Sequence, residues 1–261
     1  MTLQLGFIGF GQMAQAMAKG FNQKEHPPFT LHASSIDFDA LTAHATPLNV
    51  QPISSNQQLV DQCDWIILAV KPDQVEGVLN DIDVASFENK GVISIASGIT
   101  LDQLKQRLPK STSILTMIPN TPVCVGEGIL MCQEDTTFTQ EDLTQFKDVF
   151  SHLGTIHFAN GDAFKSLATL SGCGPAFVAM VIEAMADGMV KYGAPRDLAY
   201  QIASQTIKGT AQMQLDTNTH PGVLKDQVTS PGGTTIKGVA ALEEKGMRHA
   251  FISAMDGILD H

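Results

Sequence analysis

The sequence predicts an α/β protein in two parts: a parallel β-sheet covered by helices, followed by a region built only of helices. Up to about residue 160, short apolar runs alternate with stretches whose apolar residues recur at helical spacing. This alternation is typical of a parallel sheet with connecting helices. Beyond residue 160 the apolar runs stop and only helical patterns continue. We therefore expect two domains, at 1–160 and 161–261.

The apolar runs of the first domain predict its strands, and the stretches between them predict its helices. We expect strands at 3–8, 30–33, 65–70, 92–96, 114–118, 129–132 and 155–158. Helices are expected at 13–21, 37–44, 56–62, 72–81, 101–108 and 141–153, with Asp37 as an N-cap. The second domain predicts helices at 162–170, 175–192, 195–215, 222–228, 235–245 and 248–259. Pro175 and Pro195 fall in first turns, where proline is tolerated.

Composition indicates a folded, cytoplasmic protein. Of the 261 residues, 43% are hydrophobic and 16% are charged, which is enough to build a core. The net charge of −11 argues against nucleic acid or an anionic membrane as a partner. We find no signal-like N-terminus and no run of about 18 apolar residues, so we expect no membrane span. The cysteines form no CxxC pair and are typical of buried thiols in a reducing compartment: Cys63, Cys124, Cys132 and Cys173.

A strand at the start of the chain leads through a glycine turn into a helix, in "GFIGFGQMAQAMAKG". Gly9 permits the tight turn, Gly11 lets the backbone approach a pyrophosphate, and Ala14 takes the third place of the GxGxxG pattern. The first N–H groups of the helix have no internal partner and carry a partial positive charge. This order of elements predicts a Rossmann-type dinucleotide-binding domain.

The end of the second strand indicates which dinucleotide binds. Domains that bind NAD usually place a carboxylate there to hold the ribose 2′-hydroxyl. Here Ser34 and Ser35 occupy the tip, and Asp37 comes later as a helix cap. Two hydroxyls without a carboxylate favour NADP(H), but no arginine is present to clamp a 2′-phosphate, so NADH stays open.

Three further motifs end strands at the carboxyl edge of the sheet, where ligands bind in such folds. They are "LAVKP" at 68–72, "SIASG" at 94–98 and "MIPNTP" at 117–122. Lys71 either meets a phosphate or ribose there or lies in solvent. The small and turn-forming residues of the other two motifs leave space for a nicotinamide ring, so the three together predict a crevice.

The stretch "TSPGGTTI", at 229–236, predicts a second site in the helical domain. Its glycines allow the backbone to point N–H groups inward, and a helix begins directly after them. Free N–H groups with hydroxyls of Ser230, Thr234 and Thr235 at the rim make an anion site of the size of a carboxylate. The alternative is a Pro-Gly turn with a threonine cap, but a dinucleotide cradle in the same chain favours the anion site.

Two features of the helical domain concern packing. "SGCGPAF", at 171–177, is expected to be a small-residue turn before a helix, and both packing and ligand roles are open for it. The helix at 177–190 is apolar on more than one face, and so small a domain has difficulty burying such a helix alone. We therefore expect a homodimer in which two subunits share this helix.

The chemistry is indicated partly by what the sequence lacks. No arrangement of His with Lys or Asp suggests the base of a hydroxyacid dehydrogenase, and the acidic residues near Gly161 and Asp162 are too few for a metal site. Hydride transfer to a protonated imine needs no strong general acid, since the imine carries its own positive charge. It needs positioning, an anchor for a carboxylate and a hydroxyl near the nitrogen, which the two predicted sites supply.

These motifs, in this order, resemble those of the pyrroline-5-carboxylate reductase family from residue 3 to about residue 255. The blocks that carry the resemblance are "GFIGFGQMAQAMAKGF", "ASS", "LAVKP", "IPNTP", "SGCGPAF" and "HPGVLKDQVTSPGGTTI". The resemblance implies reduction of L-1-pyrroline-5-carboxylate to L-proline by NADPH or NADH, with hydride passing to the imine carbon. It also implies dimers formed through intertwined C-terminal helices, often assembled into rings such as a decamer.

The resemblance also implies roles for individual residues. Thr235 would be the catalytic residue, hydrogen-bonding the imine nitrogen as a polariser and not as a proton donor. Backbone N–H groups around Ser230, Gly233, Thr234 and Thr235 would hold the substrate carboxylate. No metal is implied. The dinucleotide would contact Gly9, Phe10, Gly11, Gln12, Met13, Ser34, Ser35, Asn56, Ala69, Val70, Lys71, Pro72, Ala96 and Gln227.

The sequence also departs from the family pattern, and other functions stay open. The departures are Cys173 for a serine, Phe177 for a tyrosine, Thr116 for an arginine, and Asn160 with Gly161 where some members have an acid. One rival function is a reductase of another cyclic imine, and a second is a β-hydroxyacid dehydrogenase using Lys191 or Lys208. A third, from another class, is a catalytically silent NADPH-binding protein.

Overall fold

The computed structural model describes residues 2–23 and 28–260. The chain divides into two compact units, Met1–Gly172 and Cys173–His261. The division lies inside a helix, whereas the change from strands to helices comes earlier, between Ala159 and Gly161.

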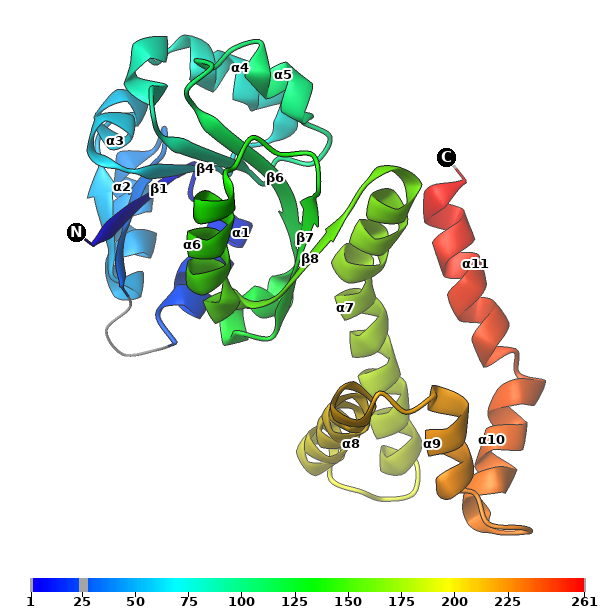
Figure 1. Cartoon of the computed structure of the whole chain (residues 1–261). Helices are drawn as coiled ribbons and strands as arrows, with labels where there is room; N and C mark the ends of the chain where they lie inside the picture. Colours follow the sequence, from blue (N-terminus) through cyan, green and yellow to red (C-terminus); the bar gives the residue numbers. More distant parts are fainter. Residues whose placement is uncertain (1, 24–27, 261) are drawn as a thin grey trace. The chain divides into compact units, whose positions relative to one another are not determined.

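An eight-stranded sheet forms the centre of the first unit, in the order β3-β2-β1-β4-β5-β6-β7-β8 (Figure 1). Neighbouring strands are parallel from β3 to β6, which confirms the parallel arrangement predicted for β1, β2, β4, β5 and β6. β7 departs from the prediction by running antiparallel to β6, because residues 120–127 are too short a connection for a parallel crossover. The strands are β1 (Leu3–Ile8), β2 (Phe29–Ser34), β3 (Val50–Ile53), β4 (Trp65–Leu68), β5 (Gly91–Ser94), β6 (Ser113–Pro119), β7 (Gly128–Gln133) and β8 (Gly154–Ala159).

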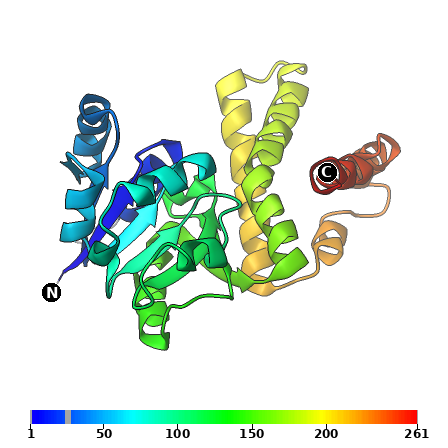
Figure 2. The same ribbon diagram turned by 90° about the horizontal axis from the view of Figure 1, so that it is seen from above.

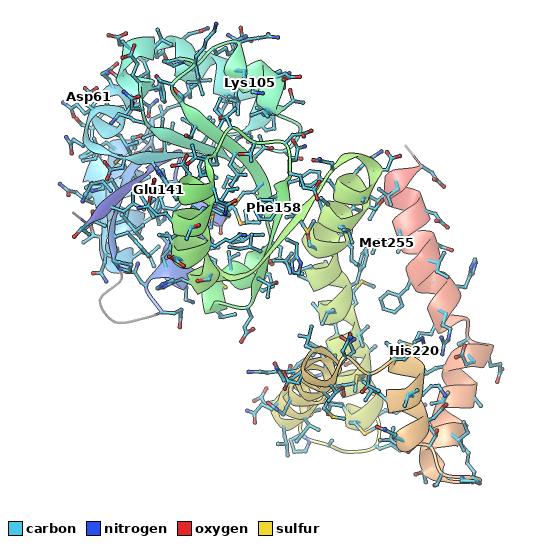
Figure 3. The ribbon with its side chains drawn as sticks, in the orientation of Figure 1. Asp61, Lys105, Glu141, Phe158, His220 and Met255 are labelled. Carbon is cyan, nitrogen blue, oxygen red and sulfur yellow. The ribbon has the colours of Figure 1, made fainter. Side chains whose placement is uncertain are left out.

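Helices cover both faces of this sheet, and the side chains along each strand alternate between the two faces. On β4, Trp65 and Ile67 belong to one apolar cluster, and Ile66 and Leu68 belong to the other. The first cluster includes residues of α1 (Gln12–Phe21), α2 (Phe38–Ala45) and α6 (Gln140–Phe150). The second includes residues of α3 (Asn56–Gln62), α4 (Pro72–Asn80) and α5 (Leu101–Lys105). Polar side chains such as Asp61 and Lys105 lie on the outer sides of these helices (Figure 3).

Local sequence signals predict the cap of α2 but not the edge strand β3. Asp37 caps α2 as predicted, since its carboxylate accepts a hydrogen bond from the Ala40 N–H at 2.9 Å. β3 was not predicted, because it has only four residues and contains Pro52. Proline argues against an interior strand but is tolerated at a sheet edge, where β3 lies.

Two of the four cysteines are fully buried. Burial raises the pKa of the Cys63 and Cys132 thiols to about 12, so both stay protonated at neutral pH. Cys124 and Cys173 are partly exposed, and all four cysteines are free thiols. The prediction of buried, unpaired cysteines therefore holds fully for two of them.

The longest helix, α7, shows that the turn predicted at 171–177 is wrong. It runs without interruption from Gly161 to Val190 and carries Pro175 inside it. Proline lacks the N–H that would donate to the carbonyl of Ser171, four residues earlier. The side-chain amide of Asn120 donates to that carbonyl instead, at 3.0 Å. Gly172, Gly174 and Pro175 therefore do not end the helix.

The second unit continues from α7 through α8 (Arg196–Thr217), α9 (Pro221–Gln227), α10 (Thr234–Glu244) and α11 (Met247–Leu259), coloured yellow to red in Figure 2. Among residues 173–260, only Ala186, Ala199 and Ala203 are buried. Large apolar side chains lie on the surface instead, among them Met180, Tyr192, Ile202, Leu215 and Ile252. In its described residues, this unit has no core of large side chains.

α7 is also long and apolar enough to cross a membrane, the one such helix in the part of the chain that the structure describes. Length and composition are weak grounds for a membrane span, because core helices of other proteins pass the same test. The apolar surface of α7 is largely exposed within this chain, and it does not by itself identify what covers it.

Candidate functional site

The carboxyl ends of four strands form one row across the sheet with Thr116 of β6. Ile8 pairs with Ser34 on one side and with Leu68 on the other. Leu68 pairs in turn with Ser94, and Ser94 with Thr116. The loops that follow β1, β2, β4 and β5 therefore leave the sheet at the same edge, where β6 continues to Pro119. This edge is where α/β folds bind their ligands.

Gly9 begins the turn after β1, and the surrounding backbone leaves no room for a larger residue. Its φ of +90° is rarely adopted by residues with a side chain. A Cβ here would lie 2.7 Å from Val70 Cγ1 and 2.9 Å from the Ala69 carbonyl oxygen. The Gly9 N–H donates to the Ser34 carbonyl at 2.9 Å, so the turn is tied to the end of β2.

Gly11, by contrast, faces open space. A Cβ on Gly11 would have no atom within 4 Å, and no side chain caps the helix α1 that starts after it. The first turn of α1 contains no acidic residue, and its free N–H groups attract an anion. Gln12 is exposed and Met13 half-buried at this helix start, while Phe10 is buried. This geometry fits the pyrophosphate of a dinucleotide.

The end of β2 carries no free carboxylate. Ser34 is buried, and its hydroxyl donates to Asn56 Oδ1 at 2.7 Å. Asn56 is the first residue of α3, so this bond joins the end of β2 to the start of that helix. Ser35 is half-buried beside them, and Asp37 is used as the cap of α2. Hydroxyl and amide groups therefore take the place where an acid would hold a ribose 2′-hydroxyl.

The motif after β4 lies against the glycine turn. Ala69 and Val70 are half-buried, and both would contact a side chain at Gly9. Lys71 and Pro72 are exposed, with Lys71 as the N-cap residue of α4 and Pro72 in its first turn. The structure thus brings together the predicted cofactor residues that follow β1, β2 and β4.

A small cavity of about 110 Å³ lies after β5 and β6. Ala96, predicted as a cofactor residue, lines it together with Thr116, Gln133 and Phe164. The Thr116 hydroxyl donates to Gln133 Oε1 at 3.0 Å across the antiparallel pair β6–β7. Gln133 was not expected here because the reversal of β7 was not predicted, and no local signal in the sequence brings Phe164 of α7 to this edge.

The threonine turn of the second unit has the form of a type II turn. The Gly233 N–H donates to the Ser230 carbonyl at 3.0 Å, and Gly232, the third of the four residues, has a φ of +71°. Proline before a glycine of positive φ is the usual sequence of that turn. Helix α10 begins directly afterwards with Thr234, and no side chain caps it.

The polar groups of this turn are available to a ligand. Thr234 and Thr235 are exposed, and the Thr235 hydroxyl makes no hydrogen bond within the described part of the chain. The Gly233 N–H is used inside the turn, so the N–H groups at the start of α10 remain for an anion. Gln227, the last predicted cofactor residue, ends α9 and is exposed.

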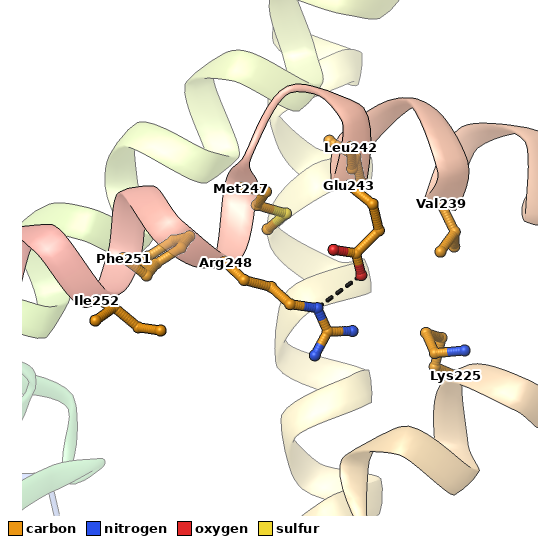
Figure 4. A pocket seen from close by; sticks show the side chains of 8 residues that line it. All are labelled: Lys225, Val239, Leu242, Glu243, Met247, Arg248, Phe251 and Ile252. Carbon is orange, nitrogen blue, oxygen red and sulfur yellow. Dashed lines mark hydrogen bonds and ion pairs between the residues drawn. The ribbon is translucent and has the colours of Figure 1, made fainter.

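The larger hollows of the second unit lie elsewhere. One, of about 650 Å³, is lined almost entirely by apolar side chains of α7, α10 and α11, such as Phe177 and Met185. Another, of about 500 Å³, contains an ion pair between Arg248 and Glu243 at 2.6 Å (Figure 4). In the described residues we find no group of three or more metal-ligating side chains.

Comparisons with known proteins match both halves of the chain. The family model "Pyrroline-5-carboxylate reductase dimerisation" matches residues 162–261, and "NADP oxidoreductase coenzyme F420-dependent" matches residues 4–98. The pyrroline-5-carboxylate reductase of Escherichia coli is 38% identical over 256 residues, which cover 98% of this chain and 95% of that protein.

Solved structures give the same result. Pyrroline carboxylate reductase of Plasmodium falciparum, with NADP bound, is 32% identical with a TM-score of 0.82, covering 98% of this chain and 95% of that one. The 1-pyrroline-5-carboxylate reductase of Streptococcus pyogenes is 30% identical with a TM-score of 0.85, covering 99% and 97%.

The two glycines of the β1 turn give a direct test of the nucleotide cradle. We expect Gly9→Ala to lower the free energy of unfolding by roughly 1–3 kcal/mol, because the added Cβ meets backbone at positive φ. Gly11→Ala has room for its methyl group, so we expect it to change stability by less than about 1 kcal/mol yet weaken NADPH binding at least about tenfold. Urea unfolding and fluorescence titration measure the two effects. Unchanged NADPH affinity in Gly11→Ala would place the dinucleotide elsewhere.

Proposed function

Because the chain belongs to the pyrroline-5-carboxylate reductase family, we propose that it reduces L-1-pyrroline-5-carboxylate to L-proline with NADPH, the final step of proline biosynthesis. The observation that carries the proposal is similarity to these reductases along nearly the whole chain. The uncapped threonine turn at the start of α10 supports it, since it offers an anion site in the helical unit. We also propose that the protein works in the cytoplasm.

NADPH would occupy the carboxyl edge of the sheet. Bound there, its nicotinamide supplies hydride. We propose that the N–H groups at the start of α1, next to Gly11, hold the pyrophosphate. Ser34 orients Asn56 by its hydrogen bond, which leaves the Asn56 amide N–H and the Ser35 hydroxyl for the 2′-phosphate. Lys71, in the motif after β4, would add a positive charge that attracts the phosphates of the cofactor. Ala69, Val70, Pro72 and Ala96 complete the lining, and Gln227 is proposed to contact the cofactor from the second unit.

The substrate would bind by its carboxylate and its ring nitrogen. We propose that the free N–H groups of Thr234 and Thr235, favoured by the dipole of α10, hold the carboxylate. Ser230 and Gly233 shape the turn that presents them. The Thr235 hydroxyl then hydrogen-bonds the imine nitrogen, fixing the orientation of the C=N bond. A threonine hydroxyl is too weak an acid to release its proton, so this residue polarises and positions the substrate.

Removing the Thr235 hydroxyl tests the assignment. We expect Thr235→Ala to lower kcat/KM for pyrroline-5-carboxylate by roughly ten- to a thousandfold, or about 1.4–4 kcal/mol of transition-state stabilisation. Thr235→Ser keeps a hydroxyl and should retain most of the activity. The assay is NADPH oxidation by the purified protein. Wild-type protein that is folded but shows no turnover would refute the proposed function, whereas full activity in Thr235→Ala would refute only the role of Thr235.

The choice between NADPH and NADH can be tested at the end of β2. We expect Ser35→Asp to lower the NADPH-to-NADH ratio of kcat/KM at least about tenfold, because a carboxylate repels the 2′-phosphate and accepts from a 2′-hydroxyl. Ser111→Asp is the matched control, since it adds the same charge at the amino end of β6. An unchanged ratio in Ser35→Asp would show that the 2′-phosphate lies elsewhere.

We further propose a homodimer formed through the helical unit, with dimers assembled into a larger ring such as a decamer. The support is the near absence of buried residues at 173–260, together with the match to a dimerisation family over 162–261. Burying this much apolar surface between two copies is strongly favourable. We expect analytical ultracentrifugation to show a dimer or larger species at micromolar concentration. A folded monomer under those conditions would contradict the proposal.

A further inference from the structure

We propose that Asn120 is a positioning residue, whose side chain fixes the course of α7 at the point where this helix leaves the nucleotide-binding unit. The proposal rests on the proposed reductase function, because it gives Asn120 a part in holding the first turns of α7, whose Phe164 lines the cavity with Ala96. It concerns a residue that touches neither ligand in the assignments above.

α7 is intrinsically weak near Ser171. Pro175 leaves the Ser171 carbonyl without its helical donor. Gly172 and Gly174 flank the gap, and each destabilises a helix interior by about 1 kcal/mol relative to alanine. A Cβ on either glycine would meet no atom within 4 Å. At this turn, α7 is therefore held straight neither by its own backbone hydrogen bonds nor by packing against the two glycines. The division between the two units falls here, between Gly172 and Cys173.

Asn120 supplies the missing hydrogen-bond donor from outside the helix. Its side chain is buried, with 5% exposure, and its Nδ2 donates to the Ser171 carbonyl at 3.0 Å. Its Oδ1 accepts from the Ile129 N–H at 2.8 Å, and its own N–H donates to the Ile129 carbonyl. Ser171 is also buried. One amide side chain thus satisfies a strand N–H and a helix carbonyl together, which needs a donor and an acceptor on the same group.

This contact is connected to the proposed cofactor site through β6. Asn120 directly follows β6, the strand whose Thr116 lies in the row at the sheet edge and lines the cavity with Ala96. The same strand that borders the cofactor site therefore also holds α7. If the contact is lost, α7 can change course at its weakest turn while the sheet stays folded.

Asn120→Asp tests the contact with a change of one group. The carboxylate still accepts from the Ile129 N–H, but it has no donor for the Ser171 carbonyl and repels it. At pH 8 we expect kcat/KM for pyrroline-5-carboxylate to fall roughly tenfold or more, with the NADPH dissociation constant changed less than about threefold. The ratio of variant to wild-type kcat/KM should recover toward pH 6, because a protonated carboxyl donates again. Glu127→Ala, at an exposed position of the same connection between β6 and β7, is the control and should behave as wild type.

A second background separates this role from a general effect on folding. Pro175→Ala restores the N–H that the Ser171 carbonyl lacks, so Asn120→Asp should cost clearly less activity in that background than in the wild type. Hydrogen exchange of residues 172–178 should be faster in Asn120→Asp alone and return toward wild type in the double variant. Equal losses in both backgrounds, or a loss of NADPH binding that parallels the loss of turnover, would overturn the proposal. The exchange measurement does not depend on the substrate, so it decides the role of the contact even if pyrroline-5-carboxylate is not reduced.

Discussion

The register of the parallel strands is the constraint on which the rest of the first unit depends. Because β1, β2, β4, β5 and β6 pair in parallel, the last residues of the first four form one row with Thr116 of β6, and their loops leave at one edge. A slip of one residue would turn every side chain to the opposite face. The same register places Val70 against Gly9 and the hydroxyl of Ser34 against Asn56. The cradle is thus a consequence of strand pairing, and no single loop could form it alone.

The helical unit depends on a different constraint, which is the lack of a core. A sheet with helices on both faces buries large side chains within one chain, whereas residues 173–260 bury only three alanines. The apolar faces of α7, α10 and α11 must therefore be covered by protein from outside the unit if the threonine turn is to be held in one conformation. If the protein forms the proposed dimer, association of the two subunits also orders the substrate site.

Much of this could be read from the sequence because the signals were local. The order of strands and helices, the Asp37 cap and the glycine turn all depend on neighbouring residues. Two features were hidden because they depend on contacts distant in sequence. The edge position of β3 tolerates Pro52, and Asn120 replaces the donor that Pro175 lacks. The reversal at β7, which brings Gln133 to Thr116, follows instead from the short connection 120–127. The threonine turn was found as a motif, but its type II geometry appears only in the backbone.

The error at 171–177 is informative about α7 itself. Two glycines and a proline within a few residues ordinarily end a helix, because a proline inside a helix costs about 3 kcal/mol or more. The helix continues here because its missing bond is made by a side chain of another element. A helix completed by its own backbone would set its direction alone. Since the missing bond of α7 is made by Asn120, which directly follows β6, the helix at Ser171 depends on a contact with another element, and β6 also lines the cavity with Ala96. The departure from local helix preference is therefore found where the chain passes from one unit to the other, as expected when a function outweighs local stability.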